Sequence, residues 1–348
     1  MSNLPQPPPA AGAAASDPLA GTKYRVLRVL GFGGWGIVYD ALHVDLGKRF
    51  AVKVLLPAYA KDRMALERLR VEAQALGQLQ SRHIVDVSDF GHTEDGRPFL
   101  VMPLLVGHTL AVEVRRRRFV PPQEAVSLVQ QLLAGLDVAH RAGLVHRDVK
   151  LDNLFLCDEG GQRVLKILDF GIAKVLPVAR GVEPPGLRTQ DGAILGTPRF
   201  MPPEQAMGRE VGPTADLYGA GVVLYELLTG RDPYSHLSGF APLLKAHVSQ
   251  DAPPPSQIAP QPVEPALSDV VMRALAKRPE DRYASAAELS AALSRAMEAC
   301  RAPALPAPVG TRDDAVPRSG PSRTIACLLV VASAVVSALV AAALVRGP

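Results

Sequence analysis

The pattern of hydrophobic and polar positions changes near residue 109. Before that point, short runs rich in β-branched and aromatic residues are typical of strands: YRVLRVL, IVYDALHV, RFAVKVL, IVDVSDFG and FLVMPLL. One amphipathic helix is predicted among them, because apolar residues recur three to four positions apart over residues 66–79. After residue 109, helical spacing covers residues 124–140, and residues 216–228 are apolar on nearly every side, which predicts a buried helix. A strand-rich part followed by a helix-rich part indicates an α+β fold with two lobes.

Segments rich in proline and alanine flank the patterned region. Residues 1–21 lack a basic start followed by an apolar run, so they do not resemble a secretory signal, and their composition predicts a disordered tail. The patterned region occupies residues 22–298, with a strand-rich lobe at 22–105 and a helical lobe at 106–298. Residues 299–324 are again rich in proline and alanine, and we expect a linker there.

Residues 325–345 form an uncharged apolar run, IACLLVVASAVVSALVAAALV. A helix of this length spans about 31 Å at roughly 1.5 Å per residue, close to the thickness of a bilayer core. A buried core helix is the alternative, but the position beyond a linker favours a transmembrane helix. Arg312, Arg318 and Arg323 precede the run and only Arg346 follows it. The positive charge therefore predicts a single-pass protein of the cell membrane, with the folded region cytoplasmic and the C-terminus on the far side.

Composition and charge narrow the class of protein. Hydrophobic residues make up 48% of the chain, which is enough to bury a core and argues against global disorder. The formal net charge of +4 comes without a continuous basic stripe, so we expect no nucleic-acid partner. The 3 cysteines form no CxxC pair, which excludes a disulfide scaffold and a zinc-finger module and fits a reducing compartment.

A glycine-rich stretch, LGFGGWG, covers residues 30–36. Gly31, Gly33 and Gly36 have the spacing G-x-G-x-x-G, and glycines let backbone N–H groups approach phosphate oxygens without interference from a Cβ atom. Dinucleotide-binding loops share this spacing but are followed by a helix, whereas β-branched residues follow here and predict a loop between two strands. A plain glycine-rich hairpin is the other alternative. Trp35 at the expected loop tip would shield phosphates from water.

A lysine interrupts the next apolar run, A-V-K-V. In a buried strand, the ammonium group of Lys53 needs a counter-charge. The helix predicted at residues 66–79 offers Glu67 and Glu72, and we favour Glu72 because it lies close to the apolar face of that helix. The alternative is a surface lysine whose stem covers apolar residues.

Two further motifs bring carboxylates, an amide and a lysine together. The segment HRDVKLDN contains Asp148, Lys150 and Asn153, and Asp169-Phe170-Gly171 follows the apolar run VLKIL. A carboxylate can orient an attacking hydroxyl, an ammonium group can neutralise developing charge, and amide and carboxylate oxygens can ligate Mg²⁺. Either motif alone could be a charged turn, but the two in this order indicate phosphoryl transfer.

Taken in order, these motifs resemble the protein kinase family, specifically the bacterial eukaryotic-like (Hanks-type) serine/threonine kinases. The resemblance covers about residues 24–295 and includes the glycine-rich loop, A-V-K, the helix glutamate, H-R-D-x-K-x-x-N, D-F-G, G-T-P-x-x-M-x-P-E and a late arginine. It implies the bilobal protein-kinase fold and a non-specific serine/threonine protein kinase. Such an enzyme transfers the γ-phosphoryl group of ATP to proteins with Mg²⁺, or Mn²⁺, as cofactor.

The resemblance also implies an ATP-binding set. Lys53 would hold the α- and β-phosphates and pair with Glu72. The hinge between the lobes would bind adenine through the Pro103 carbonyl and the Leu105 N–H, and Met102 would lie behind the ring. The remaining members of the set are Leu30, Gly31, Phe32, Gly33, Gly34, Trp35, Gly36, Val38, Ala51 and Phe155.

Catalytic and structural roles follow from the same resemblance. Asp148 would orient the substrate hydroxyl with Lys150 beside it, and Asn153 and Asp169 would hold the metal. The resemblance also implies a bridging threonine, a buried ion pair, a helix-start acid that braces the HRD backbone, and a phosphate-binding arginine. These are Thr197, the pair Glu204 and Arg282, Asp216, and Arg147.

Two positions depart from the family pattern. Phe200 replaces the usual tyrosine and Pro202 the usual alanine, in the segment that docks peptides, which leaves ATP binding untouched and affects peptide specificity. In the preceding segment, Thr189 is the best acceptor for autophosphorylation, and a phosphate there could pair with Arg147.

Several alternatives concern partners and function. The run Arg115 to Arg118 is most simply a solvated helix end, and contact with acidic lipid or an acidic partner is the alternative. A partner-binding pseudokinase and a small-molecule or lipid kinase are the competing functions. The expected partners are protein substrates with Ser/Thr acceptors, a transient homodimer for phosphorylation in trans, and membrane lipid around the C-terminal helix.

Overall fold

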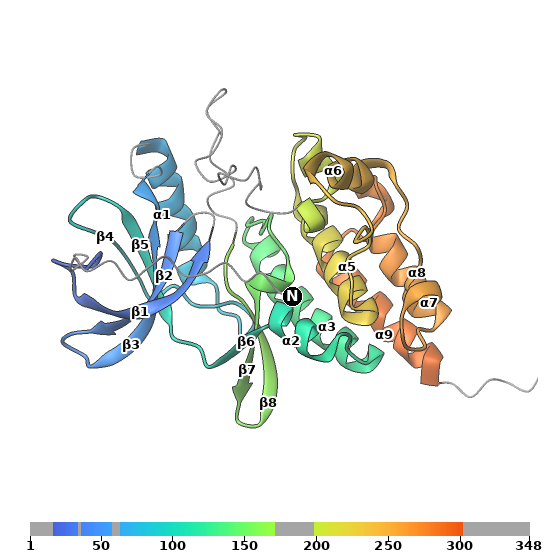
Figure 1. Cartoon of the computed structure of the whole chain (residues 1–348), viewed down its shortest axis with the longest axis horizontal. Helices are drawn as coiled ribbons and strands as arrows, with labels where there is room; N and C mark the ends of the chain where they lie inside the picture. Colours follow the sequence, from blue (N-terminus) through green and yellow to red (C-terminus); the bar gives the residue numbers. More distant parts are fainter. Residues whose placement is uncertain (1–16, 34–35, 58–62, 171–197, 302–348) are drawn as a thin grey trace, which may run out of the picture. The chain divides into compact units, whose positions relative to one another are not determined.

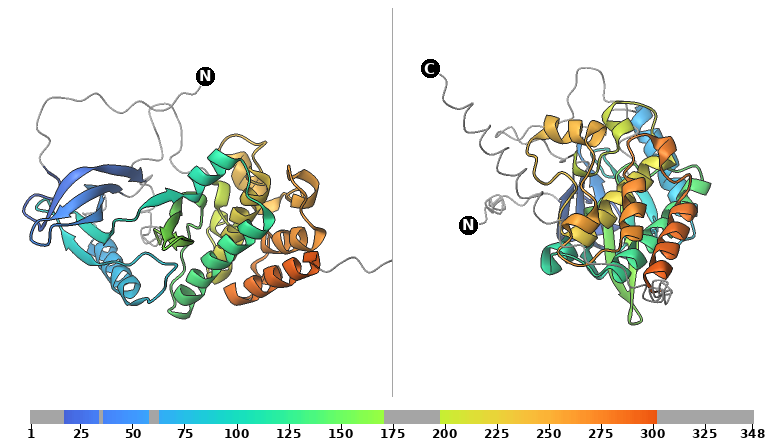
Figure 2. Two further views of the ribbon diagram at one scale, coloured as in Figure 1. Left: turned by 90° about the horizontal axis from the view of Figure 1, so that it is seen from below. Right: turned by 90° about the vertical axis from the view of Figure 1, so that its right-hand side faces the viewer.

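The computed structural model describes residues 17–33, 36–57, 63–170 and 198–301 (Figure 1). These residues belong to one unit that ends at Ala302. Figure 2 shows its strand-rich lobe beside its helical lobe. The two-lobed α+β architecture expected from the residue pattern is therefore confirmed.

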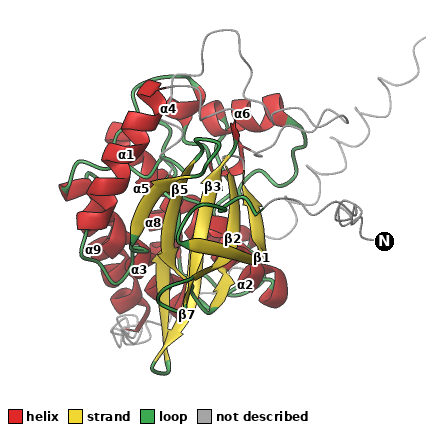
Figure 3. Cartoon of the chain, turned by 90° about the vertical axis from the view of Figure 1, so that its left-hand side faces the viewer, coloured by secondary structure: helices red, strands yellow, loops and turns green. Residues whose placement is uncertain are grey.

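A five-stranded antiparallel sheet forms the N-terminal lobe, with the strands in the order β1-β2-β3-β5-β4 (Figure 3). The strands are β1 (Tyr24–Gly33), β2 (Gly36–His43), β3 (Lys48–Leu55), β4 (Asp89–His92) and β5 (Pro98–Pro103). Helix α1 (Arg63–Gln78) follows β3, and its buried face of Leu69, Ala73 and Leu76 joins the main hydrophobic core. The amphipathic spacing of the sequence thus predicted this helix and its buried face correctly.

The folded region begins before residue 22, the boundary expected from composition. Leu19 is fully buried in a separate core on the N-terminal lobe, together with Tyr24 and Tyr39. Asp17 fixes this turn, because its carboxylate accepts hydrogen bonds from the backbone N–H groups of Leu19 (2.9 Å) and Val26 (3.1 Å). A single leucine carries no periodicity, so the sequence pattern could not reveal this contact.

Helices dominate the C-terminal lobe. A small sheet of β6 (Gly107–Thr109), β7 (Leu154–Glu159) and β8 (Gln162–Ile167) lies where the chain enters the lobe. The longer helices are α2 (Leu110–Arg117), α3 (Pro122–Arg141), α5 (Pro213–Thr229), α6 (Phe240–Ser249), α8 (Pro265–Ala274) and α9 (Ala286–Arg301). Shorter turns are η2 (Leu151–Asn153), η4 (Pro198–Phe200), α4 (Pro203–Ala206), α7 (Pro255–Ile258) and η5 (Pro279–Asp281).

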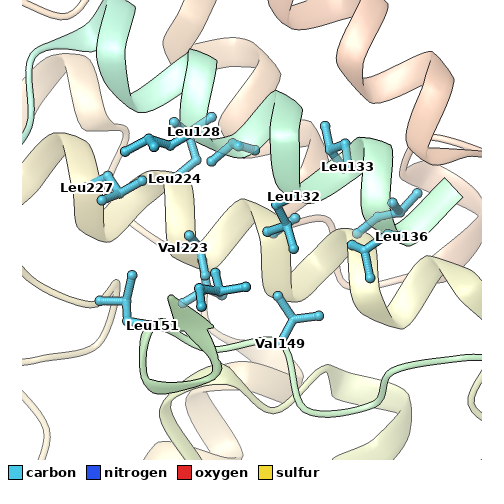
Figure 4. Close-up of a cluster of buried hydrophobic side chains, with 14 of the residues drawn as sticks. Leu128, Leu132, Leu133, Leu136, Val149, Leu151, Val223, Leu224 and Leu227 are labelled. Carbon is cyan, nitrogen blue, oxygen red and sulfur yellow. The ribbon is translucent and has the colours of Figure 1, made fainter. Parts of the chain in front are cut away.

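The core of this lobe is built around α5. Figure 4 shows leucines of α3, among them Leu132 and Leu136, facing Val223 of α5, with Val149 and Leu151 close by. All five side chains are nearly or completely buried. The segment that contains HRD is therefore attached to the most buried helix of the lobe.

One predicted strand is only partly correct. Of the run IVDVSDFG at residues 84–91, only the end is part of a strand, β4. Its first residues lie against β8 instead: Ile84 forms a bridge with Ile167, and the Val85 N–H donates to the Ile167 carbonyl at 3.0 Å. The apolar pattern reported burial correctly, but the partner strand belongs to the other lobe.

The C-terminal boundary also differs from the expectation. Helix α9 continues to Arg301, past the expected end at residue 298. Among the described residues, no helix combines the length and apolar character needed to cross a bilayer. The membrane helix predicted at residues 325–345 lies outside the described residues.

Candidate active site

The HRD segment, residues 146–153, is held by the start of α5. The buried carboxylate of Asp216 accepts hydrogen bonds from the backbone N–H groups of His146 and Arg147, both at 2.8 Å. Arg147 has a φ of 64°, a left-handed conformation that costs a non-glycine residue about 1–2 kcal/mol. The two hydrogen bonds offset this cost, so Asp216 fixes the backbone on which Asp148 stands. The bracing role expected for Asp216 is thus seen in its contacts.

The structure brings together the polar side chains of the HRD segment. The Asp148 carboxylate lies 2.8 Å from the Lys150 Nζ atom. The Asn153 amide donates to the Asp148 carboxylate at 3.0 Å and to the Asp148 carbonyl at 2.8 Å. The Asp148 side chain is 18% exposed, so a hydroxyl can reach its carboxylate. An ionised carboxylate held in this way can orient a hydroxyl and receive its proton.

Lys53 and Asp169 form an ion pair although 116 positions separate them in the chain. Lys53 stands on the buried strand β3, and Asp169 follows the end of β8. The side chains are 11% and 37% exposed, respectively. The pair therefore opens toward solvent on its carboxylate side, where an anionic ligand could approach the lysine.

Two contacts join the Lys53–Asp169 pair to the HRD segment. The backbone N–H of Leu168 donates to the Asn153 carbonyl at 2.9 Å, which places Asp169 beside Asn153. The ring of Phe170 lies 4.8 Å from the ring of His146. The ammonium group and the three oxygen-bearing side chains that the sequence predicted to converge do so.

One carboxylate partner of Lys53 is Asp169. The expected pairing of Lys53 with Glu72 stays a prediction, because the side chain of Glu72 lies outside the described residues, although its backbone belongs to α1. Glu67, the competing candidate, is 59% exposed and pairs with Arg70 at 2.6 Å on the outer face of α1. The preference for Glu72 over Glu67 therefore agrees with the contacts of Glu67.

The glycine-rich segment joins two strands. β1 ends at Gly33 and β2 begins at Gly36, and the Phe32–Ile37 pair continues the ladder into the turn. Since a strand follows the glycines, the dinucleotide-binding alternative is excluded. A Cβ atom at Gly36 would collide with the Val54 carbonyl, so this position requires glycine. Gly34 and Trp35 lie outside the described residues.

The residues expected around adenine share the face of the sheet that carries Lys53. Val38 lies opposite Lys53 on the neighbouring strand, and Met102 lies opposite Ala51. Because Ala51 and Lys53 are two positions apart on β3, their side chains point the same way. Val38, Ala51 and Met102 therefore form a continuous surface next to the ammonium group. Leu30, expected to cover the nucleotide, is 41% exposed at the edge of the sheet.

The connection between the lobes is set by backbone geometry. Pro103 ends β5 opposite Phe50, where only its carbonyl can take part in hydrogen bonding. Leu105 is half-buried in the following loop. Gly107 has a φ of 152°, and a Cβ atom there would collide with the Leu156 carbonyl, so glycine is required. β6 then pairs with β7 and places Phe155 opposite Thr109, where the chain enters α2.

The residues at this site fit a magnesium–nucleotide complex. Asn153 uses its amide N–H₂ group on Asp148, which leaves its amide oxygen as a ligand, and Asp169 adds a carboxylate on the adjoining backbone. Mg²⁺ commonly binds one or two protein oxygens and takes its other ligands from phosphates and water. Among the described residues, no cluster of three or more His, Cys, Asp or Glu side chains has metal-site geometry. The Asn153–Asp169 set is therefore suited to a metal that arrives with phosphates.

A second ion pair lies in the interior of the C-terminal lobe. Arg282 donates to both carboxylate oxygens of Glu204 at 2.7 Å, and the two side chains are 0% and 4% exposed. The same guanidinium group donates to the Thr214 carbonyl at 3.0 Å and lies over the Tyr218 ring. These contacts confirm the buried pair that the motif predicted. The pair anchors α4, which begins directly after Pro202, the residue that differs from the family pattern.

Two residues predicted from the sequence fall in a part of the chain that the structure does not describe, and one contact of the site was not predicted. Thr189 and Thr197 lie outside the described residues. His140, near the end of α3, was not predicted, yet its Nε2 atom lies 2.7 Å from the Asp216 carboxylate. Its position on the helix just before HRD was the only available signal. His140 adds a third nitrogen to the group that holds Asp216.

The fold and this site define a protein kinase. The family model for the protein kinase domain matches residues 24–294, and the chain belongs to this family. These residues comprise the five-stranded sheet, the HRD segment, the Lys53–Asp169 pair and the buried Glu204–Arg282 pair.

Similar proteins narrow the class to bacterial serine/threonine kinases. The chain is 42% identical to serine/threonine-protein kinase Pkn1 of Myxococcus xanthus over 81% of its length, but spans only 40% of that relative. It is 38% identical to PknL of Mycobacterium tuberculosis, with 85% of this chain and 72% of the relative covered. The crystal structure of the Mycobacterium tuberculosis PknI kinase domain has a TM-score of 0.63 and 27% identity, and the match covers 81% of this chain and 100% of that domain. Residues 24–294 are a serine/threonine-type kinase domain.

Proposed function

We propose that the chain is an active serine/threonine protein kinase that transfers the γ-phosphoryl group of ATP to protein hydroxyls. The observation that carries this proposal is that backbone contacts place the Lys53–Asp169 pair next to the group formed by Asp148, Lys150 and Asn153. Mg²⁺–ATP would supply the transferable phosphoryl group.

Each residue contributes one step of the transfer. The Asp148 carboxylate would orient the acceptor hydroxyl and take its proton as the new bond forms between the hydroxyl oxygen and the γ-phosphorus, while the bond from that phosphorus to the bridging oxygen breaks and ADP leaves. The Lys150 ammonium group, 2.8 Å from Asp148, stabilises negative charge that develops on the phosphoryl oxygens. Lys53 binds nucleotide phosphates, and its low exposure strengthens that interaction because little water competes.

Two alternatives make different predictions. A pseudokinase commonly lacks one of the catalytic side chains, and the presence of Lys53, Asp148, Asn153 and Asp169 argues against that alternative. A small-molecule or lipid kinase would have no use for a peptide-docking segment, and Glu204 ties such a segment to the core through Arg282. Both features favour protein phosphorylation.

The test is phosphorylation by the full chain, purified in mild detergent, with labelled ATP, Mg²⁺ and a generic protein substrate. We expect label on serine and threonine that is lost in Asp148→Asn, while that variant still binds nucleotide. Asp158→Asn, a turn residue on the β7–β8 hairpin, is the matched control and should keep full activity. Nucleotide binding without protein label in the unsubstituted chain would favour the pseudokinase.

We further propose that the kinase domain is tethered to the membrane, with residues 325–345 as a single spanning helix and the kinase domain cytoplasmic. The length of the apolar run and the arginines before it support this assignment. A tether would raise the rate of encounters between copies and favour autophosphorylation in trans at Thr189. Deletion of residues 325–348 should move the protein from the membrane fraction to the supernatant. Membrane association that survives this deletion would overturn the proposal.

A further inference from the structure

Three of four consecutive arginines at the end of α2 have no carboxylate partner among the described residues. Arg115, Arg116 and Arg118 are exposed, and within the described part of the chain the side chain of Arg115 donates only to its own helix, at the Ala111 carbonyl. Arg117 behaves differently, because it donates to Glu113 at 3.1 Å and to Glu124 at 2.7 Å. The three outer arginines therefore keep their full positive charge toward solvent.

The nearby acids do not neutralise these arginines. Glu113 is buried and contacts Arg117, the Arg163 guanidinium group at 2.6 Å and the His108 ring at 2.7 Å. Although burial opposes ionisation, hydrogen bonds from these partners lower the pKa of Glu113 to about 2. Glu124 is likewise held by Arg117 and Arg163. The carboxylates of Glu113 and Glu124 are therefore paired with cations other than the three outer arginines.

A fourth arginine joins this surface from a distant part of the sequence. The Val120 N–H donates to the Leu227 carbonyl at 2.7 Å, so the chain after α2 runs beside the end of α5. Gly230, which ends α5, touches the Arg118 backbone so closely that a Cβ atom would collide with it. Arg231, the next residue, is exposed and has no carboxylate partner in the described ranges. Arg115, Arg116, Arg118 and Arg231 are called the arginine surface below.

The arginine surface lies on the catalytic side of the C-terminal lobe. The pairing of Thr109 with Phe155 places the start of α2 beside η2, which contains Asn153. α2 has 8 residues. Its far end thus lies about 12 Å along the helix axis from the end beside η2, at roughly 1.5 Å per residue. A peptide that crosses the active site can reach the arginine surface within a few residues.

Carboxylates also lie near the end of α5. Glu226 belongs to the last turn of α5, and Asp232 follows Arg231. Burial and, to a smaller extent, the neighbouring carboxylates of Asp232 and Asp152 together raise the pKa of Glu226 to about 7, while Arg199 lowers it. An acidic residue close to these groups would be repelled. Since an extended chain advances about 3.3 Å per residue, acidic residues about four or more positions from the acceptor would reach the arginines.

We propose that the arginine surface binds an acidic stretch of the protein substrate, displaced by several residues from the phosphorylated serine or threonine. Charge complementarity and the position beside η2 favour this occupant over an acidic lipid surface, which would not need to lie next to the HRD segment. The proposal rests on the kinase activity proposed above and adds a substrate class to it.

The test uses two synthetic peptides with the same acceptor threonine and the same immediate neighbours. One peptide carries four glutamates at the positions four to seven residues before the acceptor, and four more at the positions four to seven residues after it. The other peptide carries glutamines at all of these positions. For the full chain at 50 mM salt we expect the glutamate peptide to have a KM about tenfold lower, with little change in kcat. The difference should shrink to below about threefold at 300 mM salt, where screening is stronger.

The triple variant R115Q/R116Q/R118Q should lose the preference and retain the activity on the glutamine peptide. The control triple variant R25Q/R278Q/R295Q removes the same charge from exposed arginines elsewhere and should keep the preference. Binding of fluorescein-labelled peptides without ATP, measured by anisotropy, reports on the surface even if no transfer occurs. Label on neither peptide would count against the kinase activity, not against the surface.

Three results would overturn the proposal: equal affinity of the unsubstituted chain for both peptides, a preference that survives in the arginine triple variant, or an equal loss in the control variant. Vesicles containing phosphatidylserine provide the remaining comparison. If the arginine triple variant loses vesicle binding but keeps the peptide preference, the occupant is a lipid surface and the substrate assignment is wrong.

Discussion

The two ion pairs Lys53–Asp169 and Glu204–Arg282 each join a cationic side chain to a carboxylate, but in opposite surroundings. Glu204 and Arg282 are sealed from water and satisfied by each other and by backbone carbonyls. Asp169 is 37% exposed, so its pair with Lys53 can open to admit phosphates. The comparison separates two uses of charge: a closed pair fixes a segment of the fold, whereas an open pair holds charged groups ready for a ligand.

The largest expected effect comes from breaking the open pair. Lys53→Met should lower kcat/KM about 10³-fold, because a positioned cation at developing phosphoryl charge is lost. The free energy of unfolding should change by less than about 1 kcal/mol, since water can solvate the exposed Asp169 carboxylate. Kinase assays and urea unfolding of the same preparations provide the check. A large loss of stability would show that the Lys53–Asp169 pair stabilises the fold, as the Glu204–Arg282 pair does.

Breaking the closed pair should have the opposite outcome. Glu204→Gln leaves the buried Arg282 guanidinium group without its anion and should reduce the free energy of unfolding by about 3–5 kcal/mol. The double variant E204L/R282M removes both charges and should recover most of that loss, because no isolated charge remains buried. Chemical unfolding of the three proteins distinguishes these cases. Equal stability of Glu204→Gln and the parent would show that the Glu204–Arg282 pair does not stabilise the fold.

Acid sensitivity extends the comparison to a buried base. His247 is fully buried, and its Nδ1 atom lies 2.8 Å from the Tyr218 hydroxyl. Burial, assisted by the nearby Lys277 charge, lowers the pKa of His247 to about 4. In the unfolded chain the imidazole binds a proton near pH 6.5, whereas the folded chain does not. The contribution of His247 to stability is therefore complete above pH 6.5 and is lost as the pH falls toward 4.

Unfolding curves at pH 7.5, 6 and 5 provide the measurement. The parent should lose about 2 kcal/mol more than His247→Gln as the pH falls from 7.5 to 5, because only in the parent does the unfolded chain bind a proton that the folded chain does not. Parallel pH profiles for the two proteins would mean that other groups dominate acid unfolding.

The smallest expected effect concerns the exposed Glu67–Arg70 pair. Glu67→Gln should change stability by less than about 0.5 kcal/mol and leave kinase activity unchanged, since the pair is solvated and lies three residues apart on one helix. Glu72→Gln, on the same helix, should lower activity at least tenfold if Glu72 binds Lys53 during catalysis. Equal activity of the two variants would remove Glu72 from the site.

The spacing of the motifs predicted the candidate site better than the details of its contacts. Asp148, Asn153 and Asp169 could be recognised because their motifs and spacing resemble those of the protein kinase family. The contact between Lys53 and Asp169 could not, because it depends on how β3 and the end of β8 are arranged in three dimensions. His140 was missed for a similar reason: its role depends on Asp216, which lies 76 positions later.

The fold was predictable wherever periodicity was strong. The nearly uniform apolar character of residues 216–228 predicted the buried helix α5, and alternating runs predicted β1 to β3. Isolated residues carried no such signal. Leu19 fills a core position from within a proline-rich tail, and Ile84 pairs with a strand of the other lobe, so in both cases a distant partner determined the outcome.

The left-handed backbone at Arg147 ties catalysis to the integrity of the helical lobe. Its conformation is held by a carboxylate 69 positions away, at the start of the helix around which that lobe is built. A chain whose α5 has not yet packed therefore lacks a correctly placed Asp148. During synthesis, phosphotransfer can begin only after residues 213–229 have been made and have folded. A partly folded chain is therefore expected to have no kinase activity.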